Sequence, residues 1–365
     1  MVEWLAGNRI RGTSTERTTG TGFNPVPAGV NGVGGWKEVG RTTLGSAGDD
    51  INISSIPDKR YYMLLLNILN SGNSQPGVRL GNSSLDSGGN YGERWSVNGG
   101  TDQPQAPNTY HLQWVEGFNP YPLFGVDYIS NKSGEETIGI SHLTNPNTAG
   151  KGTAPVRQES VFKWTGTSLV DIIGFNNKGS GDFASDSEVV VLGWDPDDTH
   201  TDNFWEELAS VDLSGGVADT LSASIVDKKY LWIQAYIEGS ATAEAEFRVG
   251  DISLDTGTNY ANRYSSDGGS DTLEINDTSI TGNWTVGADV PIFWNIFIIN
   301  NASNEKLAIV HGARQNTAGA GSAPRRFEIV GKWAETTNQI GIVGFDNVGT
   351  GDFNTNCIMK VWGSN

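Results

Sequence analysis

The chain has 365 residues and a single cysteine, Cys357. One cysteine cannot close an intrachain disulfide, and it excludes zinc sites built from several thiolates. Free cysteines are among the most buried residue types, so we expect Cys357 to be a small core residue of the final strand.

Charged residues are also scarce, and basic residues are the minority among them. Lys and Arg together number 24 against 42 Asp and Glu, which gives a formal net charge of −18. A surface of this sign repels phosphate backbones, so nucleic acid is not an expected partner.

Long hydrophobic runs are missing as well. The longest apolar stretches, 61–66 and 290–294, are far shorter than the roughly 20 residues that cross a bilayer as a helix. The first ten residues lack the basic and then apolar pattern of a secretory signal peptide. We therefore expect no membrane insertion and no signal peptide.

The chain contains an internal repeat, in which one sequence pattern occurs twice. Trp36 recurs as Trp205, an offset of 205 − 36 = 169 residues, and the run 85–91 recurs as 254–260. This period is too long for a solenoid repeat of roughly 20–50 residues and has the length of a whole domain. The pattern predicts an N-terminal segment (1–34), copy one (35–194), a polar linker (195–203) and copy two (204–365).

Each copy has the composition of short strands separated by tight turns. The chain holds 48 glycines and few runs rich in Ala, Leu, Glu and Lys, which long helices prefer. The nearly continuous apolar segment 61–67 is typical of a strand buried between two sheets. We predict an all-β fold of two tandem homologous antiparallel β-sandwich domains, jelly-roll-like, with an extended N-terminal arm.

Motifs of common catalytic sites are absent from the sequence, which has no Gly-x-Ser-x-Gly elbow and no His-Glu-x-x-His motif. Of the four histidines, only His142 and His311 recur at equivalent places. We interpret both as structural, because a triad would need a paired nucleophile and an orienting acid. The chain is predicted not to be an enzyme, so no catalytic residue is assigned and no cofactor is expected.

The sequence offers weak candidate ligands for calcium. Asp86 with Asn90, and Asp255 with Asn259, offer oxygen ligands on glycine-containing turns. The same residues are typical of Asx turns, in which the carboxylate accepts backbone N–H groups. Because no EF-hand spacing is present, these four residues stay weak calcium candidates and no metal site is assigned.

Tryptophan is the residue type that suggests a binding surface. The pairs Trp36 with Trp205 and Trp164 with Trp333 recur at strand positions, which favours a place in the core. Tryptophans without a counterpart are freer to make surface contacts, and sugars stack on flat aromatic faces. The candidates for a glycan or subunit contact are Trp95, Trp114 and Trp294.

The leading segment 1–34 differs in kind from the two copies. It is rich in Gly, Thr and Pro and has too few apolar residues to form a core of its own. The alternatives are a disordered tail and an arm that becomes ordered only against a neighbouring subunit. We favour an assembly arm, whose predicted contact residues are Trp4, Leu5, Arg9, Ile10 and Arg11.

Two segments resemble a known group of proteins. They are the run 55–62, followed by an apolar strand and the turn 86–91, and the closing unit 181–194. Both resemble modules of tailed-virus structural proteins, of marine phage or archaeal virus type, a group that includes tail-fibre and head-decoration proteins built of jelly-roll-like β-sandwiches. The opening 4–10 also resembles the start of such proteins. The shared motifs are structural and transfer no catalytic residues.

The resemblance implies a non-enzymatic virion structural protein, a capsid-decoration or tail-fibre surface component that assembles as a homo-oligomer through symmetric contacts. It would be synthesised in the host cytoplasm and reside on the virion surface. Its partners would be other virion proteins and copies of itself. The alternatives are a carbohydrate-binding adhesin or receptor-binding protein that contacts a host surface glycan, and a double-jelly-roll major capsid protein.

Overall fold

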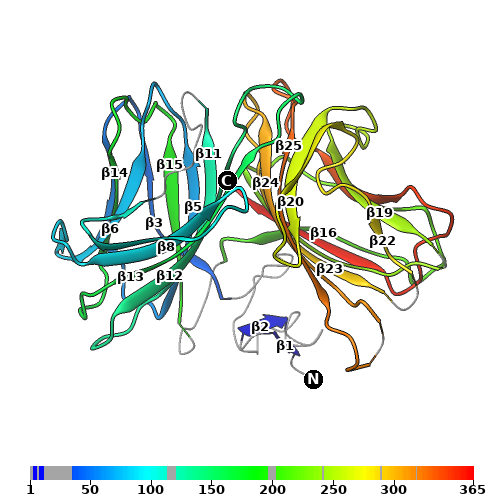
Figure 1. The fold of residues 1–365 in the computed structure, drawn as a ribbon, viewed down its shortest axis with the longest axis horizontal. Coiled ribbons are helices and arrows are strands. Elements are labelled where there is room, and N and C mark those ends of the chain that lie inside the picture. Colours follow the sequence, from blue (N-terminus) through cyan, green and yellow to red (C-terminus); the bar gives the residue numbers. More distant parts are fainter. Residues whose placement is uncertain are drawn as a thin grey trace, which may run out of the picture. The chain divides into compact units, whose positions relative to one another are not determined.

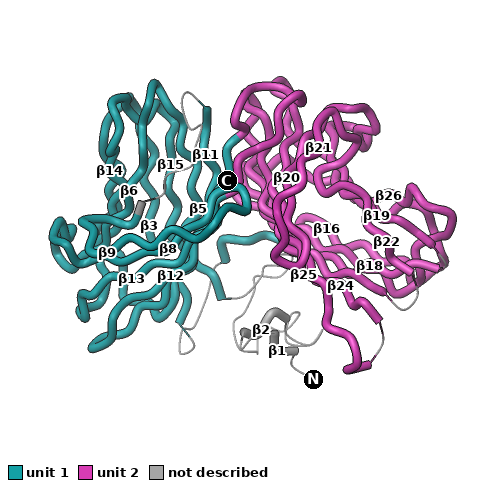
Figure 2. The backbone as a smooth tube through the Cα atoms, viewed as in Figure 1, with its two compact units in different colours: residues 1–145, 158–206 teal, residues 146–157, 207–365 magenta. Residues whose placement is uncertain are grey.

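The structure is a computed structural model, and it describes residues 3–5, 8–11, 35–112, 121–195, 203–240, 242–287, 290–317 and 319–365. The regular elements of this part of the chain are all strands (Figure 1). Two compact units contain them (Figure 2): unit 1 holds residues 1–145 and 158–206, and unit 2 holds residues 146–157 and 207–365. The prediction of an all-β chain with two antiparallel sandwiches is confirmed.

Unit 1 consists of two antiparallel sheets packed face to face. The larger sheet has eight strands in the order β3 (Lys37–Thr43), β15 (Glu188–Trp194), β5 (Tyr61–Ile68), β11 (Leu123–Ser130), β12 (Thr137–Asn145), β13 (Val156–Trp164), β8 (Tyr91–Val97) and β9 (Gln103–Asn108). The smaller sheet has the order β10 (His111–Leu112), β6 (Pro76–Asn82), β14 (Ile172–Asn177) and β4 (Asp50–Ser54), with β7 (Ser84–Leu85) beside β6.

The core of unit 1 lies between these sheets. Ile51 and Ile53 of β4 are buried while Asp50, Asn52 and Ser54 are exposed, the alternation expected of a sheet with one solvent-exposed face. The buried Tyr62 hydroxyl lies 3.1 Å from both the Val170 and Pro57 carbonyl oxygens, either of which can accept its single hydrogen, so its polar end is satisfied. Burial raises the pKa of Tyr62 to about 12.

Unit 2 repeats this strand order. Its larger sheet runs β16 (Glu206–Asp212), β27 (Ile358–Ser364), β18 (Tyr230–Ile237), β23 (Ile292–Ile299), β24 (Lys306–Arg314), β25 (Arg325–Trp333), β20 (Tyr260–Ser266) and β21 (Thr272–Asp277). Its smaller sheet runs β17 (Thr220–Ser224), β26 (Ile342–Asn347), β19 (Glu244–Gly250) and β22 (Trp284–Thr285). Two strands outside both sandwiches, β1 (Glu3–Leu5) and β2 (Asn8–Arg11), pair antiparallel.

The compact units do not follow the copy boundaries predicted from the repeat. Residues 146–157 come from copy one in sequence, yet they belong to unit 2. The physical reason is that this segment bonds to unit-2 residues: the Lys332 amine donates to the Thr148 carbonyl at 2.7 Å, and Arg157 pairs with Asp271 at 2.6 Å. Cys357 is buried just before β27, as expected of a core residue.

The described part of the chain has no helix that is long and apolar enough to span a membrane.

Candidate functional site

The predicted arm residues fall where side chains are not described. Trp4 and Leu5 are in β1, and Arg9, Ile10 and Arg11 are in β2. The rest of the segment 1–34 lies outside the described residues. Assembly contacts by this segment therefore stay a prediction.

The three tryptophans proposed as surface contacts have different outcomes. Trp294 is 0% exposed in the core of unit 2, so its assignment as a glycan or subunit contact is wrong. Its counterpart in copy one is Gly125, which lies against Leu143; in copy two Leu143 is replaced by Gly312, which makes room for the indole. Trp95 is half-buried on β8, and Trp114 lies outside the described residues.

Asp86 and Asp255 form a structural turn in each unit. Asp86 accepts hydrogen bonds from the Gly88 amide, the Asn90 side chain and the Trp164 indole, each at 2.8 Å. Partial burial alone would raise the pKa of Asp86, but these donors hold it below its ordinary value. Asp255 accepts the same three bonds from Gly257, Asn259 and Trp333. These N–H donors make both sites Asx turns and leave fewer carboxylate lone pairs for a calcium ion.

The repeated histidines lie at corresponding places on the larger sheets. His142 of β12 is opposite Val126 of β11, and His311 of β24 is opposite Glu328 of β25. Burial lowers the pKa of His311 below its ordinary value, although the nearby Glu328 carboxylate opposes the shift. A neutral imidazole at this position agrees with the structural interpretation of His311.

A third histidine forms a triad-like arrangement that the sequence did not reveal. His111 Nδ1 lies 2.7 Å from Glu93 Oε2, and its Nε2 lies 3.5 Å from Ser160 Oγ. His111 also stacks on Phe162 with ring centroids 4.2 Å apart. Ser160 is only 4% exposed and His111 is 0% exposed, whereas a catalytic serine must reach its substrate. We therefore interpret the three side chains as a buried polar network.

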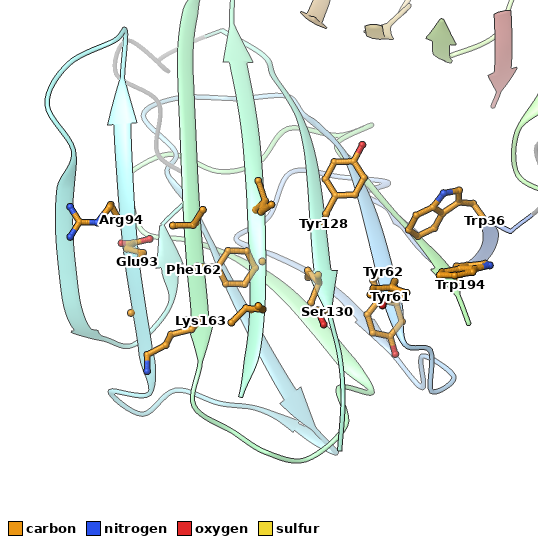
Figure 3. A pocket seen from close by; sticks show the side chains of 16 residues that line it. Trp36, Tyr61, Tyr62, Glu93, Arg94, Tyr128, Ser130, Phe162, Lys163 and Trp194 are labelled. Atoms are coloured by element: carbon orange, nitrogen blue, oxygen red, sulfur yellow. The ribbon is translucent and has the colours of Figure 1, made fainter. Parts of the chain in front are cut away.

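The main candidate site is an apolar groove on unit 1 (Figure 3). It lies on the face of the larger sheet that points away from the smaller sheet, and its volume is about 960 Å³. Its floor consists of Ile138 and Ile140 of β12 and Val161 of β13, which are 58%, 47% and 50% exposed. A continuous exposed apolar surface of this kind marks an interaction site more often than scattered single residues do.

One end of the groove is aromatic. Tyr61 and Trp194 stack with ring centroids 5.3 Å apart and an angle of 15° between their planes. Trp36, which was predicted to be a core residue, is half-buried and lies beside Trp194 (Figure 3). The Arg60 guanidinium is 4.9 Å from the centre of the Tyr61 ring. Aromatic faces in such a cluster favour stacking ligands and apolar partners.

The opposite end of the groove is charged. Lys163 lies 2.8 Å from Glu136, and Arg94 lies 3.9 Å from Asp102. All four side chains are between 44% and 58% exposed, and pairs this exposed contribute little to stability. They are therefore available to recognise a charged partner.

Sequence reasoning missed the groove because β12 reverses the usual pattern. Thr137, Gly139 and Ser141 face the core and are buried, while Ile138 and Ile140 point outward. Alternation in this segment would normally place the isoleucines inside. The only sequence signal was that the residues between them are small or polar.

Comparisons with known proteins add little to this geometry. No family model matches the chain, and no curated protein matches it. Among solved structures, domains LG4-5 of the mouse laminin alpha1 chain share 7% sequence identity with it, at 90% coverage of this chain and 89% of that chain. The TM-score of this match is 0.19, which is too low to indicate a shared fold.

Proposed function

We propose that this chain is a non-enzymatic structural protein of a virus particle, a decoration or tail-fibre component of the particle surface. On this proposal, the chain works by binding neighbouring subunits through repeated contacts and not by chemical turnover. The exposed apolar groove of unit 1 carries the proposal. Its floor residues Ile138, Ile140 and Val161 leave a water-exposed apolar surface that a partner would cover.

Two further observations support an assembly role. The protein carries a formal charge of −18, so copies of the chain repel one another over most of their surface. The apolar groove is a local site at which a partner can still bind. The segments 55–62 and 181–194 resemble virion β-sandwich modules, and both are built into the larger sheet of unit 1 or its adjoining turns.

A second candidate function is glycan binding, and the aromatic end of the groove favours it. Tyr61, Trp194 and Trp36 gather there beside the cation of Arg60. Sugar rings stack on such faces, and a receptor-binding protein of a virus would use the same surface.

Electron microscopy of the purified full-length chain, over a range of concentrations, tests the proposed function. We expect ordered oligomers, and we expect Ile140→Asp to abolish them because it places a charge on the groove floor. Retention of the oligomers in that variant would contradict the role of the groove. A glycan array with the unaltered chain and the variants Tyr61→Ala and Trp194→Ala tests the alternative, since binding that both variants lose would favour an adhesin.

A further inference from the structure

We infer that the groove of unit 1 binds the loop 315–324 of a second copy of this chain. The inference rests on the proposed function, because it names the partner of the same groove. Its basis is that unit 2 already binds the corresponding loop of copy one on the corresponding face of its own larger sheet.

The two loops are nearly the same in sequence. Asn147-Thr148-Ala149-Gly150-Lys151-Gly152-Thr153-Ala154-Pro155 is matched, 169 positions later, by Asn316-Thr317-Ala318-Gly319-Ala320-Gly321-Ser322-Ala323-Pro324. An arginine follows each loop two positions after the proline, Arg157 in one case and Arg326 in the other. A surface that binds the first loop through its backbone therefore has most of the groups needed to bind the second.

In unit 2 the loop backbone is held by side chains of the larger sheet. Lys332 donates to the carbonyls of Pro146 at 3.0 Å and Thr148 at 2.7 Å. Arg263 donates to the Pro155 carbonyl at 2.8 Å. The Gly150 amide donates to the Glu305 carboxylate. These contacts recognise the course of the loop backbone and not its side chains.

An ionic anchor fixes the end of the same segment. Arg157 lies 2.6 Å from Asp271 and 3.1 Å from Glu328. The side chains of Arg157 and Asp271 are 6% and 2% exposed, so the pair is shielded from solvent and depends on the loop remaining in place.

The groove of unit 1 presents the corresponding groups in an uncovered state. Lys332 and Arg263 are 0% and 12% exposed, whereas their counterparts Lys163 and Arg94 are 50% and 54% exposed. The apolar floor shows the same contrast: Leu307, Ile309 and Val330 are buried in unit 2, and Ile138, Ile140 and Val161 are exposed in unit 1. The acidic residues Glu305 and Asp271 are matched by Glu136 and Asp102, whose side chains are 44% and 58% exposed.

The loop of copy two is correspondingly exposed. Ala154 and Pro155 are buried in the first loop, whereas their counterparts Ala323 and Pro324 are exposed. Arg326 is 62% exposed, against 6% for Arg157. The described part of the chain therefore offers one uncovered loop of this type and one uncovered face that matches it.

Some contacts of unit 2 have no equivalent in the proposed complex, so the interaction should be weaker than its counterpart in unit 2. The Asn276 amide donates to the Lys151 carbonyl at 2.9 Å, but its counterpart Pro107 has no N–H group. The Lys151 amine donates to Asn259 at 3.3 Å, but Ala320 replaces this lysine in the second loop. We therefore expect a reversible association between chains and not a permanent one.

The stoichiometry of this contact determines the kind of assembly. Each chain contributes one loop and one groove, so the contact is heterologous, between two different surfaces. Heterologous contacts close into rings or continue as open filaments. Head-to-tail assembly of this kind suits a repeating particle surface or a fibre.

A charge exchange on the full-length chain tests the inference. Arg326→Glu alone and Asp102→Arg alone each bring like charges together at the anchor, and each is expected to weaken self-association at least tenfold in sedimentation velocity. An equimolar mixture of the two variants places the new carboxylate of one chain against the new guanidinium of the other, so it is expected to restore association. Lys178→Glu, the same charge change as Arg326→Glu at the residue after β14 of the smaller sheet, serves as the control and should associate like the unaltered chain.

Arg326 and Asp102 are exposed side chains, so each variant should keep its fold. Thermal melting of each variant checks this. Unchanged association of either single variant would overturn the inference, and so would a mixture that stays dissociated. If Ile140→Asp abolishes assembly while both charge variants assemble normally, the proposed function stands and the loop is not the partner.

A variant with the opposite effect completes the test. Ala320→Lys restores the amine that Lys151 supplies in unit 2, where it reaches the oxygen of Asn259, the counterpart of Asn90. We expect this variant to associate more tightly than the unaltered chain, by roughly two- to tenfold, the ordinary range for one added polar contact. Equal or weaker association of Ala320→Lys would count against docking of the loop in this register.

Discussion

Glu93 and His111 form a buried pair in unit 1 at positions that Asn262 and Ile280 hold in unit 2. The correspondence is supported by the backbone, since His111 pairs with Val78 and the Ile280 amide bonds to Phe247, the counterpart of Val78. The two copies therefore share these strand positions but differ in the buried side chains that occupy them. A buried acid and its partner depend on each other, because removal of either one leaves an uncompensated polar group.

This dependence gives a prediction for single and double variants. His111→Ile removes the imidazole that pairs with the buried Glu93 carboxylate and should destabilise the protein by about 3–5 kcal/mol. The double variant with Glu93→Asn and His111→Ile copies unit 2 and should recover part of that loss. Chemical denaturation of the three proteins measures both effects, and a double variant less stable than the single one would contradict the explanation.

The buried side chain of Lys306 should make the stability of the protein depend on pH. Its amine is buried in unit 2 and donates to the carbonyls of Glu335 at 2.9 Å and Asn304 at 3.0 Å. Burial lowers its pKa to about 8, although Glu335 and Glu305 oppose the shift. Between pH 8 and the ordinary lysine pKa, the unfolded chain therefore binds more protons than the folded chain, so the contribution of Lys306 to stability increases with pH.

The measurement compares the unaltered chain with Lys306→Met. From pH 8 to pH 10 the melting temperature of the unaltered chain should rise relative to that of the variant, whose position 306 cannot titrate. The upper limit is pH 10 because burial raises the pKa of Tyr62, which makes ionisation of that tyrosine unfavourable to the fold at higher pH. Parallel pH profiles for the two proteins would show that Lys306 is not the cause.

At the scale of elements, the turns that begin at Asp86 and Asp255 bind the indole N–H of corresponding tryptophans, Trp164 in unit 1 and Trp333 in unit 2. Asp86→Ala removes the acceptor of three hydrogen bonds, including that of the buried Trp164 indole, and should cost about 1–3 kcal/mol. Because N–H donors fill these turns, EDTA and added calcium should leave the melting temperature unchanged. A calcium-dependent rise that Asp86→Ala removes would revive calcium binding at this turn.

The strands that the sequence predicted well are those with strong local signals. The apolar run at β5 and the turns at Asp86 and Asp255 appear in the structure as expected, because local propensity and burial agree there. The groove strand β12 was not predictable, since its outward isoleucines oppose the usual alternation. The place of residues 146–157 in unit 2 depends on long-range contacts that no local pattern encodes.

At the scale of the whole molecule, the leading segment supplies a prediction independent of the groove. Deletion of residues 1–34 should leave both sandwiches folded, because the buried hydrophobic residues described for the two units lie at Ile51 and beyond. If the segment is an assembly arm, the truncated chain should melt like the full chain but fail to enter particles in a co-sedimentation assay. Normal incorporation of the truncated chain would show that the arm is not needed.

The duplication also explains why one chain would carry both halves of a contact between subunits. When a loop-binding domain is duplicated in tandem, the second copy can bind the loop of the first copy within one chain. The loop of the second copy and the loop-binding face of the first copy then remain for other chains. In this molecule the corresponding elements are the loop 315–324 and the groove of unit 1. The same surface chemistry would serve inside the chain and between chains.

Hydrogen exchange of the loop 315–324 tests this account most directly. Compared at low and high protein concentration by mass spectrometry, the amides of this loop should gain protection in the unaltered chain as it associates, because the Gly319 amide would donate to Glu136 as Gly150 does to Glu305. Arg326→Glu alone should show no such gain, and its mixture with Asp102→Arg should recover it. Exchange of the loop that is equally fast at both concentrations, while the unaltered chain associates, would contradict the account.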